Sequence, residues 1–138
     1  MRGLQKILKK APIELGFLYG SRIQGNITKF SDYDLAVLIN EKFYAQNNDS
    51  KTKLEMKLNL LGELFEFFSS ENVDLLILNE APINLKYKVI QKGKLIYYNE
   101  INTYYQFKAS VILEFLDFNP IFNFYQRILY KKVGISHA

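Results

Sequence analysis

The sequence predicts a single α/β domain. Short apolar runs bounded by turn residues, such as Ile13–Tyr19, are typical of buried β-strands. A longer segment, 51–68, repeats apolar residues at helical spacing, which is typical of a helix with an apolar stripe. The 138 residues suffice for one hydrophobic core, and we predict one domain over 1–138 without a linker or repeat.

The first third of the chain predicts two strands and two short helices. A helix that ends before Pro12 is expected, because apolar residues recur among lysines at helical spacing: Leu4, Ile7 and Leu8. The strand Ile13–Tyr19 follows, and a turn then leads into a short helix over 21–27. The second strand, Tyr33–Ile39, has an unbroken apolar tail, which indicates cover on both of its faces.

A polar segment over 40–53 predicts a loop after the second strand. The helix over 51–68 is expected to face the core with one apolar stripe: Leu54, Leu58, Leu61, Phe65 and Phe68. A third strand over 73–78 and a helix over 83–91 follow it.

The last third of the chain begins with a short edge strand over Lys94–Tyr98. An amphipathic helix is expected over 100–118, and Pro120 breaks or kinks it directly afterwards. A last helix is predicted over 121–132.

The composition excludes several classes of protein. There is no cysteine, so neither a disulfide framework nor a thiolate metal site is possible, which suits the reducing cytoplasm. No apolar run approaches the length that crosses a bilayer, and the basic N-terminus lacks the apolar region of a signal peptide. The net charge of +4 permits contact with phosphates or an acidic partner, but it does not require nucleic acid.

A glycine–serine turn and two aspartates stand between the first two strands. Ten residues separate Gly20-Ser21 from Asp32 and Asp34, which face one side of a strand because side chains alternate. The two carboxylates repel each other, and Mg²⁺, which prefers oxygen ligands and substrate phosphates, resolves the conflict. Backbone N–H groups at a helix start, with the Ser21 hydroxyl and the Arg22 guanidinium, form an anion site. The pattern therefore predicts a phosphate cradle beside a metal site.

A third carboxylate, Asp74, lies near the start of the predicted strand over 73–78. If this strand lies beside the second one, Asp74 comes close to Asp32 and Asp34. Each signal alone is weak, because Gly-Ser marks ordinary turns and aspartate pairs are common at strand starts. Their combination between two apolar strands predicts a catalytic site.

These residues resemble the signature of the DNA polymerase β-like nucleotidyltransferases, which is Gly-Ser, about ten residues and Asp-x-Asp. The small size and the Gly-Ser-Arg and Ser-Asp-Tyr-Asp-Leu segments resemble the minimal nucleotidyltransferases, the MntA-type antitoxins that are paired with HEPN toxins. The resemblance is sharp over 17–39 and continues more weakly through 73–78 and 91–97.

The resemblance implies a small mixed sheet with helices mainly on one face. It implies a catalytic core over about 11–98, followed by C-terminal helices over about 100–132. It assigns catalysis and metal binding to Asp32, Asp34 and Asp74, and nucleotide binding to Gly20, Ser21 and Arg22.

The implied reaction is transfer of AMP from ATP, with two Mg²⁺ ions, to a tyrosine hydroxyl of a HEPN ribonuclease toxin. The protein would then be a cytoplasmic antitoxin that needs neither a membrane nor direct contact with nucleic acid. Two alternatives stay open: a nucleotidyltransferase for a small molecule such as an aminoglycoside, and an antitoxin that acts by binding alone. A serine hydrolase is disfavoured, because the only histidine, His137, lies next to the C-terminus.

Overall fold

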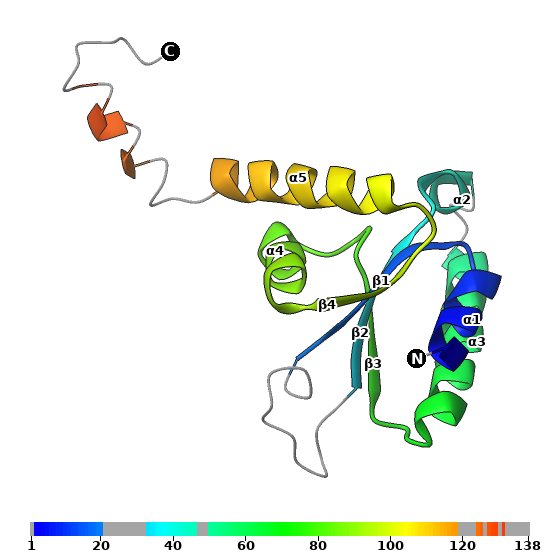
Figure 1. Cartoon of the computed structure of the whole chain (residues 1–138). Coiled ribbons are helices and arrows are strands. Elements are labelled where there is room, and N and C mark those ends of the chain that lie inside the picture. The colour runs from blue at the N-terminus through cyan, green and yellow to red at the C-terminus, as the bar shows by residue number, and fades with distance from the viewer. Residues whose placement is uncertain are drawn as a thin grey trace.

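A mixed β-sheet lies at the centre of the chain, which the computed structural model describes over residues 2–20, 33–46, 50–118, 124–125, 127–129 and 131. Within these residues the sheet has four strands: β1 (Ile13–Tyr19), β2 (Tyr33–Ile39), β3 (Val73–Ile77) and β4 (Lys94–Tyr98) (Figure 1). Their spatial order is β3-β2-β1-β4. β1 is antiparallel to β2 and β4, and β2 is parallel to β3. The predicted mixed sheet and its fold class are confirmed.

Five helices surround the sheet in the described part of the chain: α1 (Arg2–Lys10), α2 (Glu41–Gln46), α3 (Ser50–Phe68), α4 (Ile83–Lys92) and α5 (Ile101–Phe118). The predicted helix over 21–27, and half of the one over 121–132, lie outside the described residues. Among the helices that are described, none combines the length and the apolar character that a membrane crossing requires.

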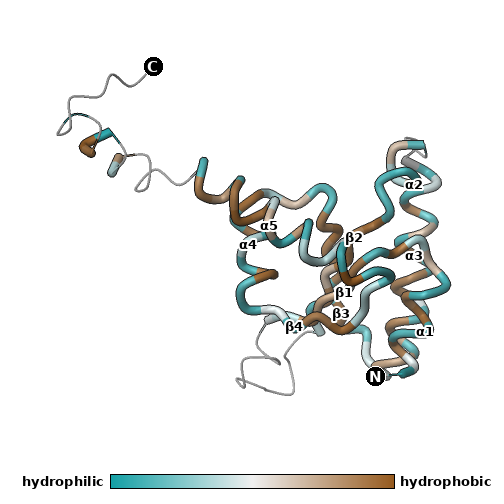
Figure 2. The backbone as a smooth tube through the Cα atoms, turned by 45° about the horizontal axis from the view of Figure 1, so that its top comes forward, coloured by the Kyte–Doolittle hydropathy of each residue, from teal (hydrophilic) through white to brown (hydrophobic). Residues whose placement is uncertain are grey.

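The helices cover both faces of the sheet, so the expectation that they lie mainly on one face is wrong. α1 and α3 cover one face, to which they contribute four buried side chains: Leu4, Leu8, Leu60 and Leu64. α4 and α5 cover the other face, as both views of the backbone show (Figures 1 and 2). There Val89 of α4 and the aromatic side chains of Tyr104 and Phe107 pack on Leu15 and Phe17.

The alternation of side chains along β2 explains why both faces need cover. Leu35 and Val37 are buried on the face of α1 and α3, whereas Ala36 is buried between them on the face of α4 and α5. A strand that is apolar on both faces is stable only where both are shielded from water. The sequence prediction for this strand is therefore confirmed.

The buried side of α3 differs in part from the predicted one. Leu60 and Leu64 are buried in the core, and the predicted Leu61 and Phe68 pack against it, whereas Leu54 and Leu58 are each 56% exposed. Apolar residues occur on more than one side of this helix, so the sequence pattern alone did not define its buried side.

A short helix, α2, occupies part of the predicted loop over 40–53. Its start is capped by Asn40, whose side-chain oxygen accepts a hydrogen bond of 3.1 Å from the backbone N–H of Phe43. The backbone oxygen of Asn40 accepts another, of 2.9 Å, from Tyr44. Asparagine is a preferred residue at this position, and its cap explains why a polar segment forms a helix.

Candidate functional site

Carboxylates from two strands meet at the end of the sheet where β1 ends and β2 and β3 begin. Asp34 of β2 is the register partner of Tyr19 in antiparallel β1. Asp34 is also the register partner of Asp74 in parallel β3. Register partners on neighbouring strands present their side chains to the same face, about 5 Å apart. The structure thus brings Asp34 and Asp74 together beside Tyr19.

These side chains lie on the face of the sheet that α4 and α5 cover. Tyr19 packs against the cluster of Phe17 and Val89 on that face. Asp34 and Asp74 share this face by alternation, because Leu35 and Leu75 belong to the opposite cluster.

Gly20 lies directly against the carboxylate of Asp34. Its φ angle is +92°, a conformation that favours glycine. A Cβ atom at this position would overlap Oδ2 of Asp34 and would lie 2.9 Å from its Cγ. The absence of a side chain therefore lets the end of β1 contact the carboxylate.

A second glycine, Gly93, packs closely against this end of β1. It follows α4 in an extended conformation, and its N–H donates a hydrogen bond of 2.7 Å to the oxygen of Val89. A Cβ atom here would overlap that oxygen and would lie 3.4 Å from Cβ of Tyr19. Gly93 thus allows the junction of α4 and β4 to pack closely beside the site.

Tyr19 is the residue at this site that sequence reasoning missed. Burial, followed by the negative charges of Asp74 and Asp34, raises the pKa of Tyr19 to about 12. The phenol therefore stays neutral and protonated beside two carboxylates. Its position could have been found from the strand register, because a hairpin of β1 and β2 places Tyr19 opposite Asp34.

The turn between α3 and β3 determines where β3, and with it Asp74, begins. Ser69 ends α3 with a φ of +51°. The N–H of Ser70 donates to the oxygen of Phe65 at 3.1 Å, and that of Ser69 to Glu66 at 3.3 Å. This pair of hydrogen bonds is a Schellman motif, which reverses the chain at a helix end.

Three predicted site residues, Ser21, Arg22 and Asp32, lie outside the described residues. Over the part that is described, no group of three acidic, histidine or cysteine side chains is placed to hold a metal ion. Asp34 and Asp74 alone contribute hard oxygen donors, the ligand type that Mg²⁺ prefers. The described donors thus fit Mg²⁺ chemically, and a complete site needs at least one further ligand.

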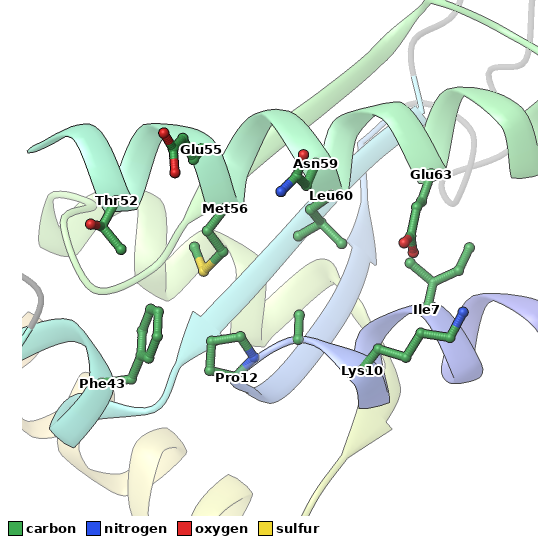
Figure 3. Close-up of a pocket in the computed structure, with 11 residues that line it drawn as sticks. Ile7, Lys10, Pro12, Phe43, Thr52, Glu55, Met56, Asn59, Leu60 and Glu63 are labelled. Atoms are coloured by element: carbon green, nitrogen blue, oxygen red, sulfur yellow. The ribbon is translucent and has the colours of Figure 1, made fainter.

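A cavity of about 350 Å³ lies elsewhere, between α1, α2 and α3 (Figure 3). Met56 and Leu60 point into it from α3, and Phe43 and Pro12 close its opposite side. It opens on the face that does not carry the carboxylates and near the end of β2 rather than its start. This cavity is therefore separate from the carboxylate site.

The family model described as "Polymerase beta, Nucleotidyltransferase" matches residues 3–102 of the chain. The protein adenylyltransferase MntA of Aphanizomenon flos-aquae (strain 2012/KM1/D3) is 32% identical over 112 residues. That match covers 78% of this chain and 73% of the relative.

Two solved structures have a similar fold. A toxin–antitoxin crystal structure with AMP-PNP contains a chain with a TM-score of 0.67 and 24% identity, covering 96% of this chain and 97% of that one. The complex of a tri-AMPylated Shewanella oneidensis HEPN toxin with its MNT antitoxin contains one with a TM-score of 0.59 and 22% identity. It covers 93% of this chain and 91% of that one.

Proposed function

The chain belongs to the polymerase beta nucleotidyltransferase family, and from this premise we propose that it is an antitoxin that transfers AMP from ATP to a tyrosine hydroxyl of a cognate HEPN ribonuclease toxin. One observation carries the proposal: Gly20, Asp34 and Asp74 converge at one end of the sheet. A nucleotidyltransferase needs a phosphate-binding backbone beside carboxylates, and the contact of Gly20 with Asp34 next to Asp74 supports such a site here.

The relatives support the substrate and the partner. The 32% identical protein is named a protein adenylyltransferase, and the match extends over most of both chains. The structural relatives include a chain of a toxin–antitoxin crystal structure with AMP-PNP and a chain of the complex between a tri-AMPylated HEPN toxin and an MNT antitoxin. We carry AMP transfer and a HEPN partner over to this chain on that basis, and we propose that the reaction takes place in the cytoplasm.

We assign the residues as follows. Asp34 and Asp74, with Asp32, would hold two Mg²⁺ ions, which would neutralise the triphosphate and lower the pKa of the attacking hydroxyl. Gly20, Ser21 and Arg22 would bind the β- and γ-phosphates through backbone N–H groups, a hydroxyl and a guanidinium.

The transfer forms one bond and breaks one. The tyrosine oxygen of the acceptor attacks the α-phosphorus of ATP, and the bond from this phosphorus to the bridging oxygen of pyrophosphate breaks. The hydroxyl proton passes to a carboxylate, for which Asp74 is suited because it is exposed at the start of β3. Positioning and charge neutralisation supply most of the rate in such reactions.

Incubation with radiolabelled ATP, Mg²⁺ and the purified toxin tests the proposal. We expect label on a toxin tyrosine and loss of ribonuclease activity. Asp34→Asn and Asp74→Asn should each lower transfer at least about hundredfold, because each removes a charge from the site. Asp117→Asn, which removes an exposed aspartate at the far end of α5, is the matched control and should keep full transfer.

The same experiment separates the alternatives. Label on an aminoglycoside rather than on the toxin would identify a small-molecule nucleotidyltransferase. Full neutralisation of the toxin by an Asp34→Asn, Asp74→Asn double variant would identify an antitoxin that acts by binding alone. Either result would overturn protein AMPylation as the function.

A further inference from the structure

α3 carries an apolar stripe on its outer side, away from the sheet. Leu54 and Leu58 are one turn apart, and each is 56% exposed although both are large aliphatic residues. Gly62 continues the same line one turn later, since residues four apart are neighbours on a helix surface. The core-facing side of the helix is a different one, occupied by Leu60 and Leu64.

Nothing within the described chain requires a glycine at position 62. A Cβ atom there would meet nothing within 4 Å. Its φ is not positive, since Gly20 is the only glycine in the described residues with that conformation. Glycine in the middle of a helix is destabilising relative to alanine. A glycine in this position is useful where another backbone or a large side chain approaches the helix closely.

We propose that a second copy of this chain packs its α3 antiparallel against this stripe, with the two-fold axis at Leu58. In that register Leu54 of each copy lies opposite Gly62 of the other. The large side chain then fills the space that the missing side chain leaves, which is how facing helices interdigitate. The contact is isologous, because the same residues are used by both copies.

The charges along α3 complement one another in this antiparallel arrangement. The first half carries Lys51, Lys53 and Lys57 with one acidic residue, Glu55, and the second half carries Glu63 and Glu66. Lys53 lies over the ring of Tyr44 and Glu63 lines the cavity beside Lys10, so the complementary charges at the stripe are those of Lys51, Lys57 and Glu66. The proposed register places Glu66 opposite Ser50, the first residue of α3 in the other copy. A carboxylate is stabilised at a helix N-terminus, so this end contact favours the antiparallel pair. A parallel pair would instead place like charges together.

The position of α3 leaves the proposed active site open in such a dimer. α3 covers one face of the sheet, whereas Asp34 and Asp74 lie on the other face with α4 and α5. ATP and an acceptor protein would therefore still reach the carboxylates in both copies. The inference does not depend on the proposed AMP transfer and can fail independently of it.

The outer side of α5 is less suited to self-association. Tyr105 and Leu113 are 59% and 65% exposed and lie eight residues apart. In a symmetric antiparallel pair about Ala109 they would face each other, a large side chain against another large one. α5 is therefore the natural comparison for testing α3, because it offers equally exposed apolar residues without the complementary glycine.

Cysteine cross-linking tests the register directly, because the chain contains no cysteine. Leu58→Cys should form a disulfide-linked dimer under mild oxidation, since the two copies of this residue meet at the axis. Leu54→Cys and Gly62→Cys should cross-link when mixed, but each should cross-link poorly alone. Leu113→Cys on α5 should stay monomeric on a denaturing gel. Efficient cross-linking of Leu113→Cys with none of Leu58→Cys would overturn the proposal.

Light scattering and sedimentation of the full chain over a dilution series give the second test. Leu58→Glu should weaken dimerisation at least about hundredfold, because it places a charge at the centre of the contact. Gly62→Ala should raise the melting temperature of the dilute monomer and yet weaken the dimer. Leu113→Glu should leave dimerisation unchanged. A wild-type chain that stays monomeric at every concentration, or a dimer unaffected by Leu58→Glu, would overturn the inference. The inference would also be overturned if the purified toxin, and not a second copy of this chain, bound the stripe on α3.

Discussion

At the scale of single residues, the site depends on a backbone contact that leaves no room for a side chain. Gly20 combines a positive φ with direct contact to the carboxylate of Asp34. The two demands are independent, since the first excludes most side chains by backbone strain and the second excludes even a methyl group by overlap. Gly93 beside it meets only the second demand, with an ordinary extended backbone.

Gly20→Ala should therefore cause a large loss of transfer activity and only a modest loss of stability. The added methyl group pushes the carboxylate of Asp34 away, so nucleotide transfer should fall at least about hundredfold. The strained backbone should cost about 1–2 kcal/mol of the free energy of unfolding. Transfer assays and urea unfolding measure the two effects. Gly62→Ala, whose methyl group enters open space, should leave the transfer rate unchanged. Equal losses of rate in both variants would refute the steric argument.

The raised pKa of Tyr19 predicts that the free energy of unfolding decreases at alkaline pH. The pKa of Tyr19 is raised to about 12 in the folded chain, by burial and then by Asp74 and Asp34. An unfolded phenol ionises near pH 10, so from there up to about pH 12 the unfolded state binds fewer protons. The free energy of unfolding must then decrease as the pH rises through this interval.

Tyr19→Phe removes this contribution. The variant should lose less stability than the wild type between pH 10 and 12, whereas below pH 10 this group should add no pH dependence. Urea unfolding at pH 8 and at several points above pH 10 measures the difference. Tyr44→Phe is a useful comparison, because the pKa of Tyr44 is also raised to about 12, by burial and by Glu80. Parallel pH profiles for wild type and Tyr19→Phe would contradict the argument.

At the scale of elements, the strands could be predicted from the sequence, whereas the buried side of α3 could not. The predicted bounds Ile13–Tyr19, Tyr33–Ile39 and Lys94–Tyr98 agree with β1, β2 and β4, because short apolar runs between turn residues leave few alternatives. In α3, by contrast, Leu54 and Leu58 resemble a core stripe as much as Leu60 and Leu64 do. Only the packing against α1 decides between them.

In the site, too, some positions could be predicted from the sequence and another could not. Asp34 and Gly20 stand in a recognisable motif, and Asp74 was expected beside them on the condition that β3 lies next to β2, as it does. Tyr19 was missed because its place in the site follows from the register of β1 against β2 and not from the apolar content of either strand.

The end of α3 yields a prediction at this scale. Ser69 adopts a positive φ that favours glycine, so Ser69→Gly should raise the free energy of unfolding by about 1 kcal/mol. Ser70→Gly is the matched neighbour, and it should destabilise, because the Ser70 hydroxyl accepts a hydrogen bond of 3.0 Å from the N–H of Asn72. Thermal unfolding of both variants measures the two shifts. A lower melting temperature for Ser69→Gly would show that the hydroxyl matters more than the backbone strain.

At the scale of the whole molecule, the sheet separates two cores with different tasks. One core joins α1 and α3 to the sheet around Leu64. The other joins α4 and α5 around Phe17, whose ring lies 6.0 Å from that of Tyr104 and 6.5 Å from that of Phe107. The carboxylates share the second face, so catalysis should depend on that core more than on the first.

Substitutions in the two cores should therefore have different local effects. Phe17 is 1% exposed and Leu64 is fully buried, so Phe17→Leu and Leu64→Ala each leave a cavity, which should cost about 1–3 and 2–5 kcal/mol respectively. Hydrogen exchange should become faster mainly in α4 and α5 for Phe17→Leu, and mainly in α1 and α3 for Leu64→Ala, because a cavity loosens the elements that line it. The transfer rate, measured well below both melting temperatures, should fall more for Phe17→Leu even if Leu64→Ala lowers the free energy of unfolding further. A rate that follows global stability alone would mean that the sheet transmits both disturbances equally and that the two cores act as one.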